Sequence, residues 1–497
     1  MEQLTCIFTS KRTVAFVVII MTFVCCVQGQ NTDFDNYKQR KLQDFATYKD
    51  SKQKSLADYR EKLNKEYADK MSRQWTSCRV SAALPAPKCP EPPKPVVKTN
   101  ETPVPTKAVT YSEYVSAVTY DTPRPFQPIA HPDNEQDATY TFSFHSTPCK
   151  VHLLKEMFFS LPNVSESTVA DGWRILSSSG YDIIADDCLN YRDQLDLNDW
   201  GYIELVKCLS QTFFCEGTNE AVLMQAYLLI QSGYKVRLAR TGDRLVLMIP
   251  FTTTIYQYSY FFFDDEKYYL LDDNKEGGTY YIFNCKFTGE KTASLDIKGE
   301  PRFFDEPTIK RTFSSSRYPD ASATISTNRN LMAFYNSCPV TSDWASYARA
   351  SLSRKVKRNL YPTLKKQIAG KSELEAANIL INFVQTAFDY KTDQEQFGYE
   401  RPLYGDELFY YPYSDCEDRS ILFSILVRDL LKLEVVLLNY PGHLATAVRF
   451  NEEVSGYYFL VKEKKYVLCD PTYIGAPVGD CMPQYVGTSA VIVEIGN

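Results

Sequence analysis

An 11-residue repeat of apolar positions follows residue 33. Four consecutive blocks between residues 34 and 77 carry, at their first and fourth positions, Phe34 and Tyr37, Phe45 and Tyr48, Leu56 and Tyr59, and Tyr67 and Lys70. Because 11 residues make about three helical turns, these positions form one stripe, apolar except at Lys70, on an otherwise charged helix. The pattern predicts a long amphipathic helix over residues 30–80. We expect the apolar stripe to be buried, either against a second copy of the helix in a coiled coil or against the folded domains.

Two later regions share one succession of patterns, helices followed by alternating strands. In the first, we expect helices at 168–178, 203–213 and 220–231 after a strand at 139–145, and strands at 234–240, 244–251, 258–263 and 267–271. In the second, we expect helices at 342–368, 374–388 and 420–431, and strands at 433–439, 444–450, 456–462 and 465–469. Helices followed by an antiparallel run of strands predict an α+β fold.

Composition marks the segments between these regions. Eight prolines lie between Pro85 and Pro105, a composition that favours extended polyproline conformation. We therefore expect a Pro-rich linker over 81–137 and an extended connector, rich in Pro, Ser and Thr, over 299–330. The folded units between and after them are predicted at 138–298 and 331–497.

The N-terminus has the features of a signal peptide. Lys11 and Arg12 precede an apolar run at 13–27, and Gly29 offers a small residue for cleavage. This predicts a signal peptide over 1–29 and a secreted, periplasmic or cell-envelope protein. The alternative is a retained membrane anchor, although the run is short for spanning a bilayer.

Length and charge narrow the function classes. With 497 residues, 44% of them apolar, the chain can bury two or three domain cores. Its net charge of -6 gives no general attraction to nucleic acid, which requires clustered Lys and Arg. Nucleic acid is therefore not expected as a partner.

The two folded regions overlay without a gap. When 221–251 is laid over 420–450, helix matches helix and strand matches strand, and five positions are identical: Leu223/Leu422, Val236/Val435, Leu238/Leu437, Leu245/Leu444 and Phe251/Phe450. We interpret this as a duplication. Gly217 then takes the place of Cys416, Arg244 that of His443, and Asp273 that of Asp470. Because the first copy has no imidazole, it is expected to be catalytically inactive, a pseudoenzyme domain.

Three residues of the second copy have the order of a thiol nucleophile, a base and an orienting acid. Cys416 precedes an apolar helix, whose free N–H groups would stabilise a thiolate. His443 opens a strand and is the only histidine after residue 152, so it is the candidate base. Asp470 closes a strand and would orient the ring. Singly, each residue is more often structural: an inert cysteine, a turn histidine and a strand-capping aspartate.

An aromatic loop of about two dozen residues before Cys416 supplies further candidates. Tyr411 or Tyr413 would donate, with the Cys416 backbone N–H, to the oxyanion of a tetrahedral intermediate. Since no second histidine and no paired cysteine spacing accompany His443, no metal site is expected. No cofactor is expected either.

The motifs Asp415-Cys416-Glu417-Asp418, Gly442-His443 and Cys469-Asp470-Pro471 resemble those of the transglutaminase-like superfamily. The resemblance covers about 372–475 and, faintly, 197–275. It implies two papain-like units, each with helices packed on an antiparallel sheet, and catalytic roles for Cys416, His443 and Asp470. Leu444 and Ala445 follow the histidine where the family often has an aromatic residue, so the substrate wall differs.

Two hypotheses follow. The first is an exported cysteine peptidase or amidase that forms a Cys416 thioester with a peptide or protein substrate, or transfers the acyl group to an amine. The second is a non-catalytic cell-envelope binding or scaffold protein with a relic triad, in which a disulfide from Cys416 to Cys469 or Cys481 would block the thiol. Self-association through residues 34–77 is compatible with both.

Overall fold

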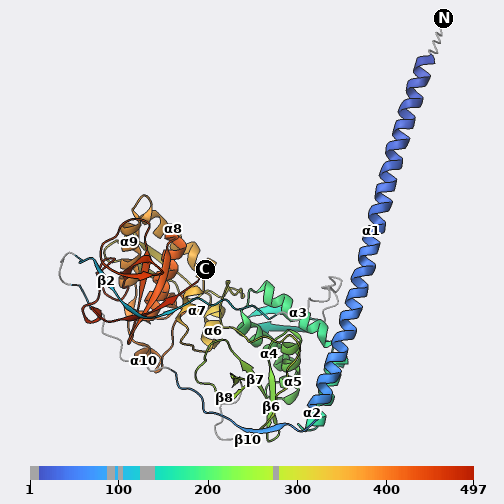
Figure 1. Ribbon diagram of the computed structural model, residues 1–497, viewed down its shortest axis with the longest axis horizontal. Coiled ribbons are helices and arrows are strands. Elements are labelled where there is room, and N and C mark those ends of the chain that lie inside the picture. Colours follow the sequence, from blue (N-terminus) through green and yellow to red (C-terminus); the bar gives the residue numbers. More distant parts are fainter. Residues whose placement is uncertain are drawn as a thin grey trace. The chain divides into compact units, whose positions relative to one another are not determined.

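The computed structural model describes residues 11–86, 96–98, 104–123, 140–178, 180–271 and 279–496, with side chains from Phe34 onward except at 35, 50 and 53 (Figure 1). The chain divides into two units, Met1–Glu66 and Tyr67–Asn497. Within the described ranges, no helix is both long enough and apolar enough to cross a membrane.

A single uninterrupted helix, α1, spans Lys11–Met71 and forms all of the first unit that the structure describes (Figure 1). The sequence predicted an unbroken helix over residues 30–80, whereas the helix begins at Lys11 and ends at Met71. The helix ends earlier because the Trp75 Nε1 donates to the Met71 carbonyl over 2.8 Å, and the next residues form strand β1, Thr76–Arg79. Residues 11–29, predicted as a signal peptide, belong to this helix.

The N-terminal sheet of the second unit has the strand order β1-β10-β6-β7-β9-β8, with every neighbouring pair antiparallel. Its remaining strands are β6 (Arg237–Thr241), β7 (Arg244–Pro250), β8 (Tyr260–Phe263), β9 (Glu266–Leu270) and β10 (Thr279–Phe283). Four helices accompany it: α2 (Glu166–Ser178), α3 (Tyr181–Gln194), α4 (Asp199–Phe214) and α5 (Asn219–Gln231). A separate hairpin joins β4 (Tyr140–Phe144) and β5 (Thr147–Val151).

The C-terminal sheet has the order β2-β17-β18-β16-β15-β19-β3. Its strands are β15 (Glu434–Tyr440), β16 (His443–Arg449), β17 (Tyr457–Val461), β18 (Lys464–Cys469), β19 (Ala490–Glu494) and the short edge strands β2 (Lys107–Val109) and β3 (Tyr111–Val115). Helix α11, Cys416–Leu426, packs on β16 and is buried along its whole length, as its all-round apolar pattern predicted. A π-helical turn, Val427–Leu431, extends it.

Both sheets share one topology. The order β8-β9-β7-β6-β10 of the first equals β17-β18-β16-β15-β19 of the second. The hairpin registers also agree, because Thr241 pairs with Arg244 in the first sheet as Tyr440 pairs with His443 in the second. The structural agreement supports the duplication that the overlay predicted, and it places Arg244 at the position of His443.

The linker predicted over 81–137 contains β2 and β3, which pair in parallel with the edge strands β17 and β19. Only Thr110 separates β2 from β3, so one short segment meets both edges and the sheet is curled. Composition suggested a spacer outside any fold. The structure differs because unpaired N–H and C=O groups at a sheet edge bind any extended segment that reaches them.

Other elements differ from the pattern-based expectation. The connector over 299–330 contains the hairpin β11 (Arg311–Ser314) and β12 (Ser322–Ile325) and the start of helix α6, Arg329–Ser337. The helix predicted at 342–368 is two helices, α7 (Trp344–Arg349) and α8 (Arg354–Ile368), separated where the Ser353 side chain caps α8. The helix expected at 374–388 is α9, Glu373–Thr386, which starts with a capping box between Ser372 and Glu375.

Candidate active site

Cys416 is the first residue of α11, four residues before the predicted helix start. The residue before it, Asp415, closes a capping arrangement in which its backbone N–H donates to Asp418 over 3.2 Å. This fixes the entry of the chain into the helix. The backbone N–H groups of the first turn have no partners within the helix and point toward its N-terminus, which favours negative charge there.

His443 and Asp470 meet in the interior of the C-terminal body, the part of the second unit that is built around the C-terminal sheet. The imidazole Nε2 lies 2.9 Å from Asp470 Oδ2, and the histidine side chain has no exposed surface. The second carboxylate oxygen accepts the backbone N–H groups of Thr472 and Tyr473 over 2.9 and 3.2 Å. Asp470 is therefore held rigidly, and its hydrogen bond leaves Nδ1 as the ring nitrogen that can exchange a proton with another group.

The Cys416 sulfur lies beside this ring but donates elsewhere. Its thiol makes a 3.1 Å hydrogen bond to Glu417 Oε2. The His443 Nδ1 is buried and has no hydrogen-bond partner of good geometry among the described residues. A rotation of the thiol from Glu417 toward Nδ1 would complete a sulfur, imidazole and carboxylate series in the order that the sequence predicted.

The electrostatics of the site favour a charged imidazole. Burial, the largest influence, lowers the pKa of His443, but the charge and hydrogen bond of Asp470, together with the nearby Cys416, outweigh it and raise the pKa to about 10. An imidazolium beside the sulfur stabilises a thiolate. The site is therefore suited to hold a thiolate and imidazolium pair.

This raised pKa predicts a pH dependence of stability. The folded state keeps the His443 proton up to about pH 10, whereas the unfolded chain releases it near pH 6.5. The stabilisation is fully present below pH 6.5 and is lost as the pH rises to 10, at up to about 1.4 kcal/mol per pH unit. Denaturant unfolding between pH 6 and 10 should show this loss in the wild type and not in His443→Gln. Parallel pH profiles of the two proteins would contradict it.

A cluster of carboxylates surrounds the start of α11. One oxygen each from Asp393, Asp415 and Asp418 lie within 4.8 Å of one another, as do oxygens from Asp393, Glu400 and Glu417. This spacing suits a hard divalent cation. However, the three aspartates already accept backbone N–H groups from Arg401, Asp393, Leu403 and Asp415. Burial also raises the pKa of each, so protons neutralise part of the cluster, and its evident role is to fasten the aromatic loop to the helix.

One arginine balances this cluster. Arg419 is 1% exposed and donates to the carbonyls of Gln385 and Phe388 over 3.3 and 2.8 Å and to the Ser414 hydroxyl over 3.3 Å. Its guanidinium carbon also lies 5.2 Å from the centre of the Tyr390 ring. Arg419 therefore joins α9, the loop and α11 around the candidate nucleophile.

The two tyrosines predicted as oxyanion donors have other neighbours. The Tyr411 ring stands edge-on to Phe397 at 5.1 Å and under the Arg401 guanidinium at 5.0 Å. The Lys391 ammonium lies 4.0 Å from the Tyr413 ring centre. Their oxyanion role stays a prediction.

Tyr390 is a further candidate donor. Tyr390 pairs with Ser414 in the short parallel ladder of β13 (Asp389–Tyr390) and β14 (Tyr413–Ser414), and Ser414 lies two residues before Cys416. Its hydroxyl oxygen is buried and has no hydrogen-bond partner among the described residues. Burial and the nearby Cys416 raise the pKa of Tyr390 well above its usual value, so the hydroxyl keeps its proton. Sequence reasoning missed it because only pairing of β13 with β14 brings it beside the nucleophile.

Aromatic rings cover the candidate site. The Tyr485 ring stacks on the His443 imidazole, with ring centres 4.9 Å apart, and its centre lies 5.0 Å from that of the Tyr440 ring. Cys416 itself is only 4% exposed. Tyr485 belongs to a segment that packs on the sheet with Met482, Val436 and Leu438. A substrate reaches the sulfur only if this segment or the aromatic loop moves.

Two of the three corresponding positions of the first copy lie on the surface. Gly217 and Arg244 are exposed, and Asp273 lies outside the described residues. The helix start is still fastened to the strand start, since the Asn219 side chain accepts the Leu245 N–H over 2.8 Å. The fold of the first copy thus keeps the architecture of the site while its residues offer no base at the position of His443.

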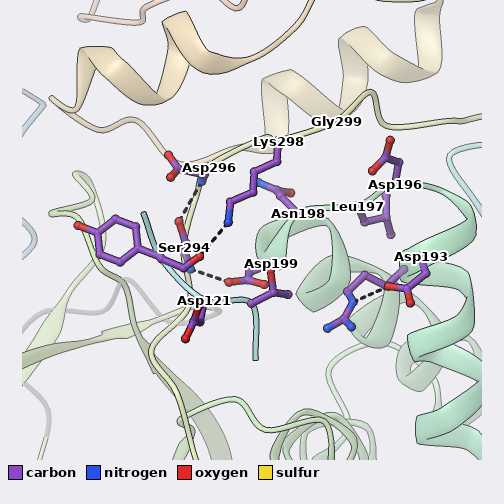
Figure 2. A pocket seen from close by; sticks show the side chains of 13 residues that line it. Asp121, Asp193, Asp196, Leu197, Asn198, Asp199, Ser294, Asp296, Lys298 and Gly299 are labelled. Carbon is purple, nitrogen blue, oxygen red and sulfur yellow. Dashed lines mark hydrogen bonds and ion pairs between the residues drawn. The ribbon is translucent and has the colours of Figure 1, made fainter. Parts of the chain in front are cut away.

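The N-terminal body has a separate polar cavity of about 290 Å³ (Figure 2). Its lining is acidic and includes Asp121, Asp193, Asp196, Asp199 and Asp296, together with Arg192 and Lys298. Figure 2 shows that part of the lining is bonded internally: the Ser294 N–H donates to Asp199 over 2.8 Å, and its hydroxyl accepts the Asp296 N–H. The lining includes none of the residues predicted for either copy of the site.

All ten cysteines described, from Cys78 onward, are free thiols, including Cys416, Cys469 and Cys481. No bridge therefore occupies the candidate nucleophile. Comparisons of the chain with protein-family models, with curated proteins and with solved structures find no match.

Proposed function

We propose that the C-terminal body is a papain-like thiol hydrolase of the transglutaminase-like type, acting on peptide or amide bonds of an exported protein or peptide substrate. The observation that carries the proposal is the 2.9 Å hydrogen bond between buried His443 and Asp470, with Cys416 at a helix start beside the ring. A buried, charged imidazole is costly unless its partner is fixed. A thiol beside the charged imidazole offers a chemical reason for this cost, because the imidazolium stabilises a thiolate.

The reaction begins from the ion pair of the Cys416 thiolate and the His443 imidazolium, whose Nδ1 carries a proton. The thiolate then attacks the substrate carbonyl, forming a carbon–sulfur bond and an oxyanion. The imidazolium gives its proton to the leaving amine as the carbon–nitrogen bond breaks, which leaves a thioester on Cys416. Water, deprotonated by His443, attacks the thioester and releases a carboxylic acid and the thiol. An amine in place of water gives a new amide, so one site supports both hydrolysis and amine transfer.

The oxyanion of this reaction would accept two hydrogen bonds. One comes from the Cys416 backbone N–H, which is free at the helix start. The second comes from Tyr390, whose buried hydroxyl keeps its proton and has no partner among the described residues. A donor that is already in place stabilises charge that develops only in the transition state.

Tyr390→Phe is expected to lower kcat by about 10- to 1,000-fold with little change in KM. Alkylation of Cys416 by iodoacetamide forms no oxyanion, so its rate should stay close to that of the wild type. Tyr411→Phe and Tyr413→Phe serve as the matched comparison, because each removes one phenolic hydroxyl from the same loop region. If one of them, and not Tyr390→Phe, lowers kcat, the oxyanion donor is the tyrosine that the sequence first suggested.

A non-catalytic scaffold is the second candidate. The observations that favour it are the closed surface over the site, with Tyr485 stacked on His443, and the hydrogen bond from the thiol to Glu417. Incubation of the full chain with an amide-bond peptide library, with and without a small primary amine, separates the candidates. Release of carboxylic acid supports hydrolysis, incorporation of the amine supports transfer, and neither product in the presence of a reactive Cys416 supports the scaffold.

Export to the cell envelope remains part of the proposal. It is supported by the charged and apolar pattern of residues 1–29. The first copy would serve as a pseudoenzyme domain, since Arg244 stands at the position of the catalytic base.

A further inference from the structure

The first unit presents a stripe of large apolar side chains on one face of α1, formed by Phe34, Tyr37, Phe45, Tyr48, Leu56 and Tyr59 and interrupted by Lys41 and Lys52. We propose that this stripe pairs with the stripe of a second copy of the chain in a parallel, two-stranded coiled coil. The inference is independent of the enzymatic proposal.

Every side chain of the stripe is exposed. The aromatic residues of the first two blocks are 59–66% exposed, and Leu56 and Tyr59 are 40% and 47% exposed. The stripe extends over 26 residues, about 39 Å of helix. Burial of this row of apolar side chains is favourable, so soluble proteins seldom leave so many of them along one face open to water.

The fourth block shows what the first position of the repeat does when a partner is present. Tyr67, which opens this block, is 3% exposed and contacts three aromatic rings, those of Trp173, Phe283 and Phe287, at 4.8 to 5.3 Å. Trp173 and the two phenylalanines belong to the same unit as Tyr67. The repeat therefore specifies packing positions, and the preceding three blocks repeat them along the part of α1 in the first unit.

The spacing identifies the partner as another helix of the same repeat. Eleven residues over three turns give 3.67 residues per turn, so the stripe runs almost straight along the axis and matches a second stripe of equal period over its whole length. A flat lipid surface or an irregular protein surface does not require this constancy. A second copy supplies it by identity.

The charges beside the stripe favour the parallel orientation. The fifth position of the repeat, on one flank, carries Lys38 and Lys49, and the eleventh, on the other, carries Asp44 and Glu66, all exposed. In a parallel pair, opposite flanks of the two helices face each other, so Lys49 meets Asp44 of the partner subunit. An antiparallel pair would bring like charges together.

Two lysines within the stripe set the strength of the pair. Lys41 and Lys52 occupy the eighth position, where the third block has Leu63, and their ammonium groups fold over the rings of Tyr37 and Tyr48 at 5.9 and 5.6 Å. A charged residue in a helical seam costs stability. The wild-type dimer should therefore be weak, and removal of a seam lysine should strengthen it.

The matched test is Lys52→Leu against Lys54→Leu in the full chain. The two variants make the same change two residues apart, but residue 54 faces away from the stripe. Sedimentation equilibrium should show a dimer dissociation constant at least ten times lower than wild type for Lys52→Leu and unchanged for Lys54→Leu. Phe45→Ser should raise the constant by at least tenfold. Equal behaviour of the two lysine variants, or a monomer throughout the series, would overturn the proposal.

Orientation is tested by Tyr37→Cys and Gln39→Cys. In a parallel, in-register pair, residue 37 faces its own copy, so mild oxidation should give a disulfide-linked dimer for Tyr37→Cys and far less for Gln39→Cys. Equal yields would overturn the parallel seam. Binding of monomeric protein to phosphatidylcholine–phosphatidylserine vesicles, weakened by Lys52→Leu, would replace the second copy by a lipid surface, because a membrane gains from the lysine charge that a seam loses.

Discussion

Replacement of Cys416 by alanine is expected to abolish turnover of any peptide or amide substrate, with a loss of at least about 10⁴-fold in kcat/KM. No other group in the proposed reaction forms the covalent bond to the acyl carbon, so neither His443 nor Asp470 substitutes for the sulfur. Labelling of the native protein by iodoacetamide at this site should disappear with the activity. Mass spectrometry of the labelled peptide and a product-release assay measure the two effects.

Cys481→Ala is the matched control. Cys481 is a buried free cysteine of the same body, 7% exposed, and it takes no part in the proposed chemistry. Its variant should keep activity close to wild type, and a thermal melt shows whether either substitution disturbs the fold. Turnover that survives in Cys416→Ala would place the activity elsewhere and would end both the C-terminal mechanism and the expectation that the first copy is inactive.

Arg419→Met is expected to destabilise the C-terminal body by about 3–5 kcal/mol, the cost of leaving buried charges without their partner. Arg419 is the guanidinium beside the carboxylates of Asp415 and Asp418, and it satisfies two carbonyl groups and one hydroxyl. Methionine is of similar length, so packing is largely kept and the charge is removed. Denaturant unfolding at pH 7 measures the loss.

The same substitution at Arg354 separates charge burial from side-chain shape. Arg354 pairs with Glu300 at 3.2 Å, but its side chain is 66% exposed. Exposed ion pairs contribute about 0–1 kcal/mol, so Arg354→Met should change stability by less than that. A loss for Arg419→Met as small as for Arg354→Met would show that protons, and not the arginine, neutralise the cluster. The deficit should also shrink at low pH, where the neighbouring carboxylates are protonated.

Sequence patterns located the helices and strands around the site well, for local reasons. The all-round apolar helix after Cys416, the Pro-Gly turn before His443 and the capping box at Ser372 each depend on residues close in the chain. Patterns missed α3, β10 and β19. They also treated residues 342–368 as one helix, since a serine cap at Ser353 is compatible with either one helix or two.

The sheet order supports the predicted duplication more strongly than the sequence does. Five identities in 31 aligned residues are weak on their own, whereas five strands in one order with one hairpin register form a common architecture. The registers also refine the alignment. Leu270 pairs with Met248 as Leu468 pairs with Ala447, so by residue count Asp272, next to the predicted Asp273, corresponds to Asp470.

The sequence by itself determined the period of α1, the order of Cys416, His443 and Asp470, and the helical and strand segments that carry them, because these depend on local periodicity, turns and caps. Only the tertiary structure decided that β2 and β3 join the sheet edges, that Tyr390 stands near the sulfur, and that the thiol donates to Glu417. These contacts join residues through strand pairing and buried charge. Neither strand pairing between distant segments nor the electrostatics of a buried interior produces a periodic pattern in the sequence.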